Sequence, residues 1–177
     1  MKNLLIIGGT GFIGYHLSKA AIKKGWKVTS LSRKKPKKNR TVAEVKYIFC
    51  NISKKNNLKK KIKKNFLFVV NLGGNIDHSS KKEVYKNHLE GFKNLCDILL
   101  SRNIKTFVQI GTSVEYGKQS SPHSENKDKI PSASAYAEAK YLATKYAQNL
   151  FIKKKFPIVV LRLYQAYGPN QKTDRLI

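Results

Sequence analysis

The sequence has 177 residues, enough for one domain with a packed core and hardly enough for two. A hydrophobic content of 41% argues against disorder, and no apolar run approaches the ~18 residues of a membrane-spanning helix. The 36 lysines and arginines against 10 acidic residues give a net charge of +26, which fits either a polyanion partner or a lysine-rich solvated surface.

The chain opens with a short apolar run that meets a cluster of glycines. Residues 4–7 fit a buried strand and are too short for a signal peptide, and residues 15–24 carry apolar side chains at helical spacing. The glycines between them fit the dinucleotide fingerprint in two spacings, Gly9-x-Gly11-x-x-Gly14 and Gly8-x-x-Gly11-x-x-Gly14. Such glycines let backbone N–H groups approach a pyrophosphate at the positive end of the following helix. The pattern predicts dinucleotide binding, and the alternative is a tight strand-to-helix turn without a ligand.

A second strand, expected at 27–31, leads to the position that distinguishes NAD from NADP. An NAD site has Asp or Glu about 20 residues after the glycines, where it accepts from the ribose 2′-hydroxyl. Here Ser32 and Arg33 stand at that position, with Lys34 and Lys35 beside them. A hydroxyl and a guanidinium suit a 2′-phosphate. We therefore expect NADP as the cofactor, with NAD as the alternative.

Apolar runs alternate with helical segments up to residue 110. The pattern predicts, in order, a strand at 45–52, a helix at 53–64 capped by Ser53, a strand at 66–72, a helix at 84–100 and a strand at 106–110. The unbroken apolar character of the strand at 66–72 is typical of a parallel strand covered on both faces. Gly73-Gly74 follows this strand, and a glycine at a strand's carboxyl end lets a ligand approach the backbone.

The segment after residue 110 holds residue types of an acid–base site. Residues 111–117 form a small polar cluster, and a helix is expected at 134–151. Tyr136 and Lys140 are four residues apart and share one face of this helix. A lysine ammonium near a phenol lowers the phenol pKa, which suits it for proton exchange with a carbonyl or alcohol. Such a pair is frequent on protein surfaces, and its place after the glycine fingerprint is what favours catalysis.

A sixth strand is expected at 158–163. Strands that alternate with helices throughout predict an α/β fold with a doubly wound parallel sheet of about six strands and helices on both faces. Cys50 and Cys96 match no metal or redox spacing, so we expect no metal site and a cytoplasmic protein with reduced thiols.

Six motifs follow one another along nearly the whole chain: Gly8/Gly11/Gly14, Asn71-Leu72-Gly73-Gly74, Asn87-x-x-x-Gly91-x-x-Asn94-Leu95, Thr112 before Tyr116-Gly117, Tyr136-x-x-x-Lys140 and Arg162-x-x-x-x-Tyr167-Gly168-Pro169. Together they resemble the extended short-chain dehydrogenase/reductase family, and more narrowly its nucleotide-sugar epimerase/dehydratase/reductase branch. The resemblance implies a Rossmann fold that binds NAD(P) and acts on a nucleotide sugar.

The resemblance also implies roles for individual residues. Thr112 would hydrogen-bond the substrate oxygen, Tyr136 would be the general acid/base, and Lys140 would bind the nicotinamide ribose and lower the Tyr136 pKa. The implied cofactor-binding residues, besides Tyr136 and Lys140, are Gly8, Thr10, Gly11, Phe12, Ile13, Gly14, Ser32, Arg33, Asn51, Ile52, Leu72, Gly73, Gly74 and Asn87. A homodimer through the helices near 84–101 and 134–151 is implied as well.

Departures from the family pattern indicate the reaction. Dehydratases of this branch carry Asp-Glu after the threonine, where this chain has Ser113-Val114, so dehydration is not expected. Residues 111–117 are more similar to the 4-keto-sugar reductases, and we expect an NADPH-dependent reductase of that kind, or else an epimerase. Asn51 replaces an Asp that contacts adenine, and Gln165 replaces an Asn near the substrate.

Family members continue for roughly another domain's worth of residues, which supply the last sheet strand and most of the nucleotide-sugar pocket. We therefore interpret residues 1–177 as one NAD(P)-binding Rossmann domain, incomplete at its C-terminus and without the substrate domain. The alternative is a non-catalytic Rossmann protein or a truncated fragment that binds NADP or a polyanion such as RNA through its basic surface. No membrane partner is expected, and the lysine runs contain few aromatics on which bases could stack.

Overall fold

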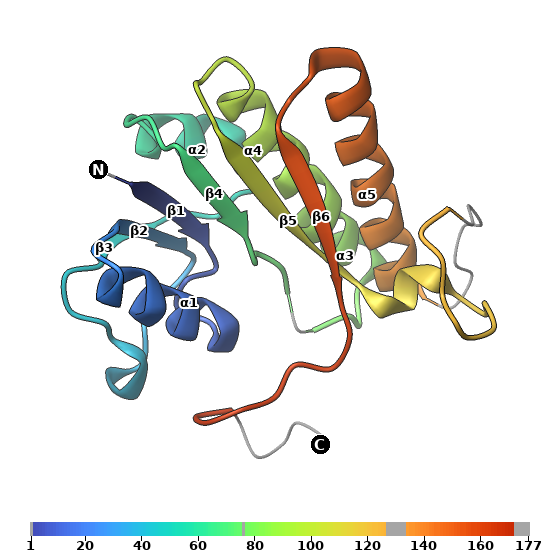
Figure 1. The fold of residues 1–177 in the computed structure, drawn as a ribbon, viewed down its shortest axis with the longest axis horizontal. Helices are drawn as coiled ribbons and strands as arrows, with labels where there is room; N and C mark the ends of the chain where they lie inside the picture. Colours follow the sequence, from blue (N-terminus) through green and yellow to red (C-terminus); the bar gives the residue numbers. More distant parts are fainter. Residues whose placement is uncertain (1, 76, 127–133, 172–177) are drawn as a thin grey trace.

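The computed structural model describes residues 2–75, 77–126 and 134–171. Within them, six parallel strands form one sheet in the order β3-β2-β1-β4-β5-β6 (Figure 1). The strands are β1 (Asn3–Ile7), β2 (Lys27–Ser32), β3 (Lys46–Phe49), β4 (Phe68–Asn71), β5 (Thr106–Thr112) and β6 (Ile158–Leu163). The chain builds outward from β1 in one direction and then, from β4, in the other. The predicted Rossmann-type sheet is confirmed, and the β1–β4 boundary is the switch point where such sheets bind ligands.

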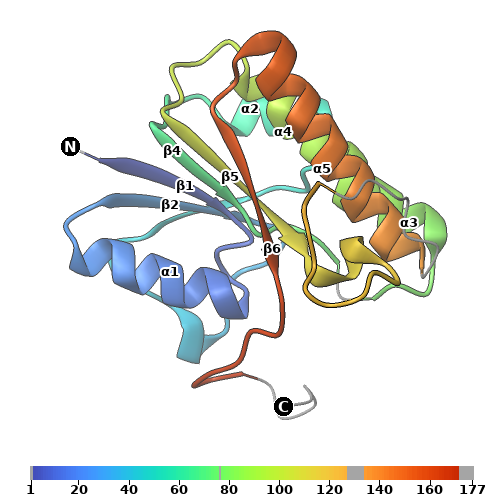
Figure 2. The same cartoon turned by 45° about the vertical axis from the view of Figure 1, so that its right-hand side comes forward.

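The helices lie on both faces of this sheet. They are α1 (Phe12–Lys23), α2 (Lys55–Lys61), α3 (Lys81–Tyr85), α4 (Gly91–Leu99) and α5 (Ala135–Lys154), with short 3₁₀ turns at Lys38–Arg40 and Ser113–Tyr116 and a π-helical turn at Lys86–Glu90. Figure 2 shows α1 on one face, and α2, α4 and α5 on the other. None of the helices in the described part of the chain is long and apolar enough to cross a membrane.

The core is divided between the two faces by the alternation of strand side chains. Leu5 and Ile7 of β1 belong to the larger apolar cluster, on the side of α2, α4 and α5, whereas Leu4 and Ile6 belong to the smaller cluster beside α1. All four side chains are almost completely buried. This is why the strand reads as a continuous apolar run: a central parallel strand is covered on both faces.

Two predicted helix starts differ from the structure. The helix expected at 84–100 begins at Lys81, because the Ser80 side chain accepts a hydrogen bond from the Glu83 N–H at 3.3 Å and caps the first turn. Its first turn is polar and therefore gives no apolar signal. The cap expected at Ser53 does not form, because its N–H and hydroxyl both donate to the Asn51 side-chain oxygen at 3.0 Å.

Candidate functional site

A cavity of about 640 Å³ lies at the carboxyl ends of the central strands. It is bounded by the residues that follow β1, β2, β3 and β4, and by the start of α1. The sequence-predicted cofactor residues that line it are Gly8, Thr10, Gly11, Phe12, Ile13, Gly14, Ser32, Arg33, Asn51, Ile52, Leu72, Gly73, Gly74 and Asn87. All the predicted cofactor-binding residues except Tyr136 and Lys140 therefore line one cavity.

The glycine turn brings α1 directly onto the backbone that follows β1. Gly8 has φ +79°, a left-handed conformation that favours glycine. A Cβ on Gly14 would lie 2.4 Å from the Gly8 carbonyl oxygen and 2.5 Å from the Gly9 Cα, which are backbone atoms that cannot give way. The turn has the close helix–strand packing and the tight bend that a pyrophosphate cradle requires.

The rim of the cavity is positively charged. Arg33, Lys34 and Arg40 line it, and Arg33 is exposed, with its guanidinium 3.5 Å from the Asn75 side-chain oxygen. Ser32 is buried, and its Oγ accepts a hydrogen bond from the Thr10 N–H at 3.3 Å. The serine hydroxyl thus ties β2 to the glycine turn, and the cationic side chains face the space beyond it. This charge complements a phosphate group.

The segment after β6 forms a wall of the same cavity. It runs back toward α1 (Figure 1), where the Pro169 carbonyl lies 2.9 Å from His16 Nε2 and the Asn170 carbonyl accepts from the Arg40 guanidinium at 2.6 Å. Ala166 and Gln171 in this segment line the cavity. Sequence reasoning did not place Arg40 or Gln171 here, because no local pattern joins residues so far apart in the chain.

Asn51 lies in the cavity wall with its side-chain oxygen engaged internally. That oxygen accepts both hydrogen bonds from Ser53, at 3.0 Å each. The amide therefore holds the turn after β3, whereas the family pattern led us to expect an adenine contact from this oxygen.

The three expected catalytic residues meet between the end of β5 and the start of α5. Thr112 ends β5, and Tyr136 lies in the first turn of α5, which Ser134 caps by accepting from the Ala137 N–H at 3.1 Å. The Thr112 side chain lies near enough to Tyr136 to act on the phenol pKa as a hydrogen-bonding group. Lys140 is buried one turn further along, and its Nζ donates to the Ile110 carbonyl. Because Ile110 also lines the cavity, this group adjoins the proposed cofactor space.

The charge environment of Tyr136 differs from expectation. Burial raises the pKa of Tyr136, and the negative charge of Glu115 adds to this, whereas the Thr112 hydrogen bond lowers it. The net direction is upward, and Lys140 is not among the groups that shift it. Burial lowers the pKa of Lys140 to about 8, partly offset by Glu115. The expected lowering of the phenol pKa is therefore corrected: a buried phenol favours its neutral form, and the lysine binds a backbone carbonyl instead.

Glu115 is a buried anion that sequence reasoning missed. Its carboxylate accepts hydrogen bonds from the Thr112 N–H at 2.7 Å, the Thr144 hydroxyl at 2.6 Å and the Arg162 Nε at 3.2 Å. These partners come from β5, α5 and β6, so one side chain ties together the elements that carry Thr112, Tyr136 and Lys140. A glutamate inside the small polar cluster at 111–117 was the only signal available.

Two histidines beside Tyr136 were also missed. His78 and His88 both contact the Tyr136 ring. His78 follows β4, and His88 lies in the π-helical turn. The position of His88 directly after Asn87 was the one sequence signal for it, and His78 had none. Among the described residues, no group of three or more His, Cys, Asp or Glu side chains could hold a metal ion.

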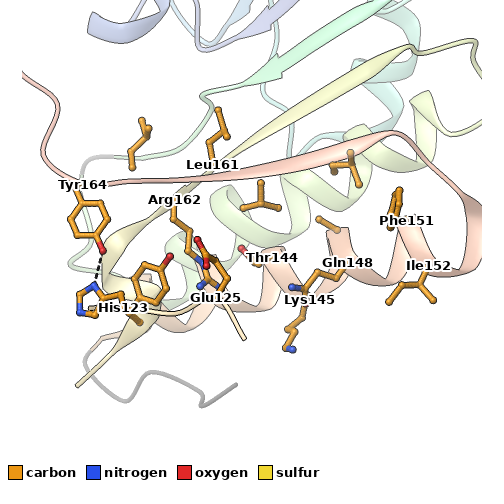
Figure 3. Close-up of a pocket in the computed structure, with 15 residues that line it drawn as sticks. His123, Glu125, Thr144, Lys145, Gln148, Phe151, Ile152, Leu161, Arg162 and Tyr164 are labelled. Carbon is orange, nitrogen blue, oxygen red and sulfur yellow. Dashed lines mark hydrogen bonds between the residues drawn. The ribbon is translucent and has the colours of Figure 1, made fainter. Parts of the chain in front are cut away.

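A larger cavity, of about 1070 Å³, lies along the edge of the sheet and contains none of the predicted site residues. Figure 3 shows it between β6, which contributes Leu161 and Arg162, and α5, which contributes Thr144 and Gln148. The Tyr164 hydroxyl lies 2.6 Å from His123 Nδ1 at one end. Outward-facing side chains of β6 are about half exposed here, because β6 is the edge strand. Volume alone favours this cavity, but the glycine turn and the Tyr136 group adjoin the smaller one.

Comparison with known proteins identifies the family and the fold. Residues 4–177 match the model of the NAD dependent epimerase/dehydratase family. A UDP-N-acetyl-alpha-D-glucosaminuronate decarboxylase of Bacillus cytotoxicus is 25% identical over an alignment 182 residues long. The alignment covers 97% of this chain and 56% of that protein.

Solved structures share the fold. A UDP-glucose 4-epimerase from Thermotoga maritima, determined with UDP-glucose, superimposes with a TM-score of 0.86 at 22% identity, covering 96% of this chain and 58% of that one. A UDP-glucuronic acid 4-epimerase from Bacillus cereus, determined with NAD, gives a TM-score of 0.82 at 23% identity, covering 98% and 60%. The chain thus spans somewhat more than half the length of these relatives.

Proposed function

The chain belongs to the NAD dependent epimerase/dehydratase family, and from this premise we propose that it binds NADP(H) and takes part in reducing the 4-keto group of a nucleotide-activated sugar. The observation that carries the proposal is a shared residue: Ile110 lines the glycine-turn cavity, and its carbonyl accepts the hydrogen bond from Lys140. The cofactor cavity and the Thr112–Tyr136 pair therefore meet at the carboxyl ends of the strands.

The cavity fits a dinucleotide. The missing Cβ of Gly14 leaves room for α1 to pack on the turn, and Arg33, Lys34 and Arg40 supply positive charge at the rim. When bound, the nicotinamide would supply the hydride, which is chemistry that no side chain offers. The cationic rim favours NADPH, because a 2′-phosphate gains charge-assisted hydrogen bonds that a 2′-hydroxyl does not.

Tyr136 is suited to give a proton to the carbonyl oxygen during reduction. Its raised pKa keeps the phenol protonated near neutral pH, the form that donates. The Thr112 hydroxyl, close to Tyr136, would hold the oxygen that receives the proton. Lys140 fixes the start of α5 on β5 through the Ile110 carbonyl. Positioning by these groups, together with proton donation by Tyr136, is this chain's share of the reaction.

The substrate class is proposed from the relatives. The decarboxylase and the two epimerases are each named for a UDP-sugar. We therefore place a nucleotide sugar, with its keto carbon, against Tyr136.

A cofactor titration followed by a substitution tests the proposal. Nicotinamide fluorescence at low and moderate salt should show binding that prefers NADPH and survives salt. In the full-length protein, Tyr136→Phe should keep that affinity and lower the rate of 4-keto-sugar reduction by about 10²- to 10⁴-fold. Tyr146→Phe, on the same helix, is the matched control and should leave the rate unchanged. Equal loss of binding and rate in Tyr136→Phe would contradict the assigned role.

The charge of +26 supports a second candidate function, binding of a polyanion such as RNA. Such binding would weaken steeply with salt, because it releases counterions. RNA affinity that falls steeply with salt, together with no affinity for either nicotinamide cofactor, would favour this function over the reductase.

We also propose a homodimer through the segments 84–101 and 134–151. Their helices, α4 and α5, cover the same face of the sheet (Figure 2). An interface in which α4 and α5 of one protomer pack against the same helices of its partner requires both helices to lie on one face. Sedimentation velocity should show a dimer, and a monomer at all concentrations would contradict it.

A further inference from the structure

A π-helical turn places two consecutive polar side chains in the protein interior. The turn, Lys86–Glu90, separates α3 from α4. Asn87 and His88 within it are each only 5% exposed. Asn87 is satisfied locally, because its Nδ2 donates to the Glu83 carbonyl at 2.6 Å. Because π-helical turns are frequent at functional sites, we looked for a functional reason for the burial of His88.

His88 belongs to a cluster of three rings that includes the proposed proton donor. Its ring centroid is 5.0 Å from that of Tyr136, with the planes at 77°. His78 stacks on Tyr136 at 4.2 Å with the planes at 14°, and the two imidazole centroids are 5.7 Å apart. The phenol ring is thus held by an imidazole on two sides.

Only one nitrogen of His88 has a hydrogen-bond partner. Nε2 lies 3.3 Å from the Asn75 nitrogen and 3.2 Å from the Asn75 carbonyl oxygen, so the backbone satisfies it in either tautomer. Nδ1 is buried and has no partner in the described part of the chain. A buried polar atom without a partner costs about 1–3 kcal/mol, so the position calls for a ligand group.

The unpartnered edge of the imidazole packs on Gly74, and Gly74 lines the cofactor cavity. A Cβ on Gly74, which lines that cavity, would be 2.4 Å from Cε1 and 2.9 Å from Nδ1 of His88. Only glycine at this position leaves the ring where it is. Nδ1 is therefore at the boundary between the end of β4 and the Tyr136 ring.

The imidazole is neutral at physiological pH. Burial lowers the pKa of His88 to about 4, and the positive charges of Lys140, His78 and Arg33 act in the same direction, whereas the Asn75 hydrogen bond raises it. A neutral imidazole offers Nδ1 as a donor in one tautomer and as an acceptor in the other. A hydroxyl group, which both donates and accepts, pairs with either form.

We propose that His88 is a substrate-positioning residue whose Nδ1 hydrogen-bonds a hydroxyl group of the sugar held against Tyr136. The inference rests on the proposed function, because it takes the substrate to be a nucleotide sugar. His78 contributes by stacking on the phenol, and Gly74 by leaving room for the ring.

Nitrogen NMR of the histidine-labelled full-length protein, saturated with NADP, tests this directly with UDP-glucuronic acid as the probe. The Nδ1 resonance of His88 should shift as the probe binds, and its titration should follow the binding curve. His88→Phe, which keeps the ring, should weaken probe affinity by about 2- to 10-fold, the value of one hydrogen bond, and leave NADPH affinity unchanged. His123→Phe, in the other cavity, is the control and should change neither affinity.

The outcomes separate this inference from the function on which it rests. A wild-type protein that binds NADPH and the probe without a shift at Nδ1 overturns the role of His88 and leaves the proposed function standing. Unchanged probe affinity in His88→Phe does the same. A wild-type protein that binds NADPH but not UDP-glucuronic acid overturns the inference for this sugar class. Absence of binding to either cofactor overturns the proposed function, and this inference with it.

Discussion

The Glu115 carboxylate and the Arg162 guanidinium form an ion pair with Nε and Oε2 3.2 Å apart, in which the Glu115 side chain is fully buried and that of Arg162 is 10% exposed. The pair links β6 to the polar cluster at the end of β5. Its isolation from water means that either partner alone would leave an uncompensated charge in the interior.

Arg162→Met should therefore destabilise the protein by about 3–5 kcal/mol. The double substitution Glu115→Gln with Arg162→Met should cost less, since neither charge of the pair is then left buried without the other. Urea unfolding measures both. The exposed pair Lys55–Asp97, with side chains 52% and 43% exposed, is the control, and Lys55→Met should cost no more than about 1 kcal/mol. Equal costs for Arg162→Met and Lys55→Met would contradict the role of burial.

Gly14→Ala should destabilise the protein although it lies within α1. In an ordinary helix interior, alanine is more favourable than glycine by roughly 0.5–1 kcal/mol. Here the new Cβ would lie 2.4 Å from the Gly8 carbonyl oxygen, so we expect a loss of about 1–3 kcal/mol instead. NADPH affinity should fall with it. The sign of the change in the urea midpoint of Gly14→Ala tests this prediction. Lys19→Ala, at an exposed position of the same helix, is the control, and its free energy of unfolding should stay within about 0.5 kcal/mol of the wild type.

Lys140 should make stability increase at alkaline pH. Its pKa is about 8 in the folded protein against an ordinary value of 10.5. Between these values the unfolded chain binds more protons, so the free energy of unfolding rises with pH in that window. The wild type should therefore gain stability relative to Lys140→Met from pH 8 to 10.5, because other titrating groups cancel in the difference. A difference that stays constant over that window would contradict the burial of a charged lysine.

Ser32→Asp with Arg33→Asn should move cofactor preference toward NADH. The carboxylate can accept from the ribose 2′-hydroxyl and repels a 2′-phosphate, and the guanidinium is lost. Hydrogen bonds to charged groups contribute about 1.5–3 kcal/mol, so the affinity ratio should change by about 10- to 100-fold. Arg33→Lys keeps the charge and should retain the preference for NADPH. An unchanged ratio in the double variant would show that these positions do not contact the 2′ group.

Much of the fold could be predicted because its signals are local. The strands β1, β2 and β6 fall within a residue or two of their predicted ranges. Each is a short apolar run that ends at glycine or polar residues, and alternation with helices implies a parallel sheet. The π-helical turn at Lys86–Glu90 was not predicted, because the apolar periodicity around it continues without a break.

In the site too, residues with local sequence signals could be predicted, whereas contacts between distant segments could not. The glycine turn and the Tyr136–Lys140 pair lie within single segments, so their spacing, together with the order of the motifs along the chain, identified them in the sequence. Only the tertiary structure brought Arg40 and Gln171 to the glycine-turn cavity, and His88 to the Tyr136 ring. It also decided that the Lys140 ammonium meets the Ile110 carbonyl. Spacing within a segment determines which residues share a turn or a helix face, whereas packing between segments decides which charges are buried and which polar atoms are left for a ligand.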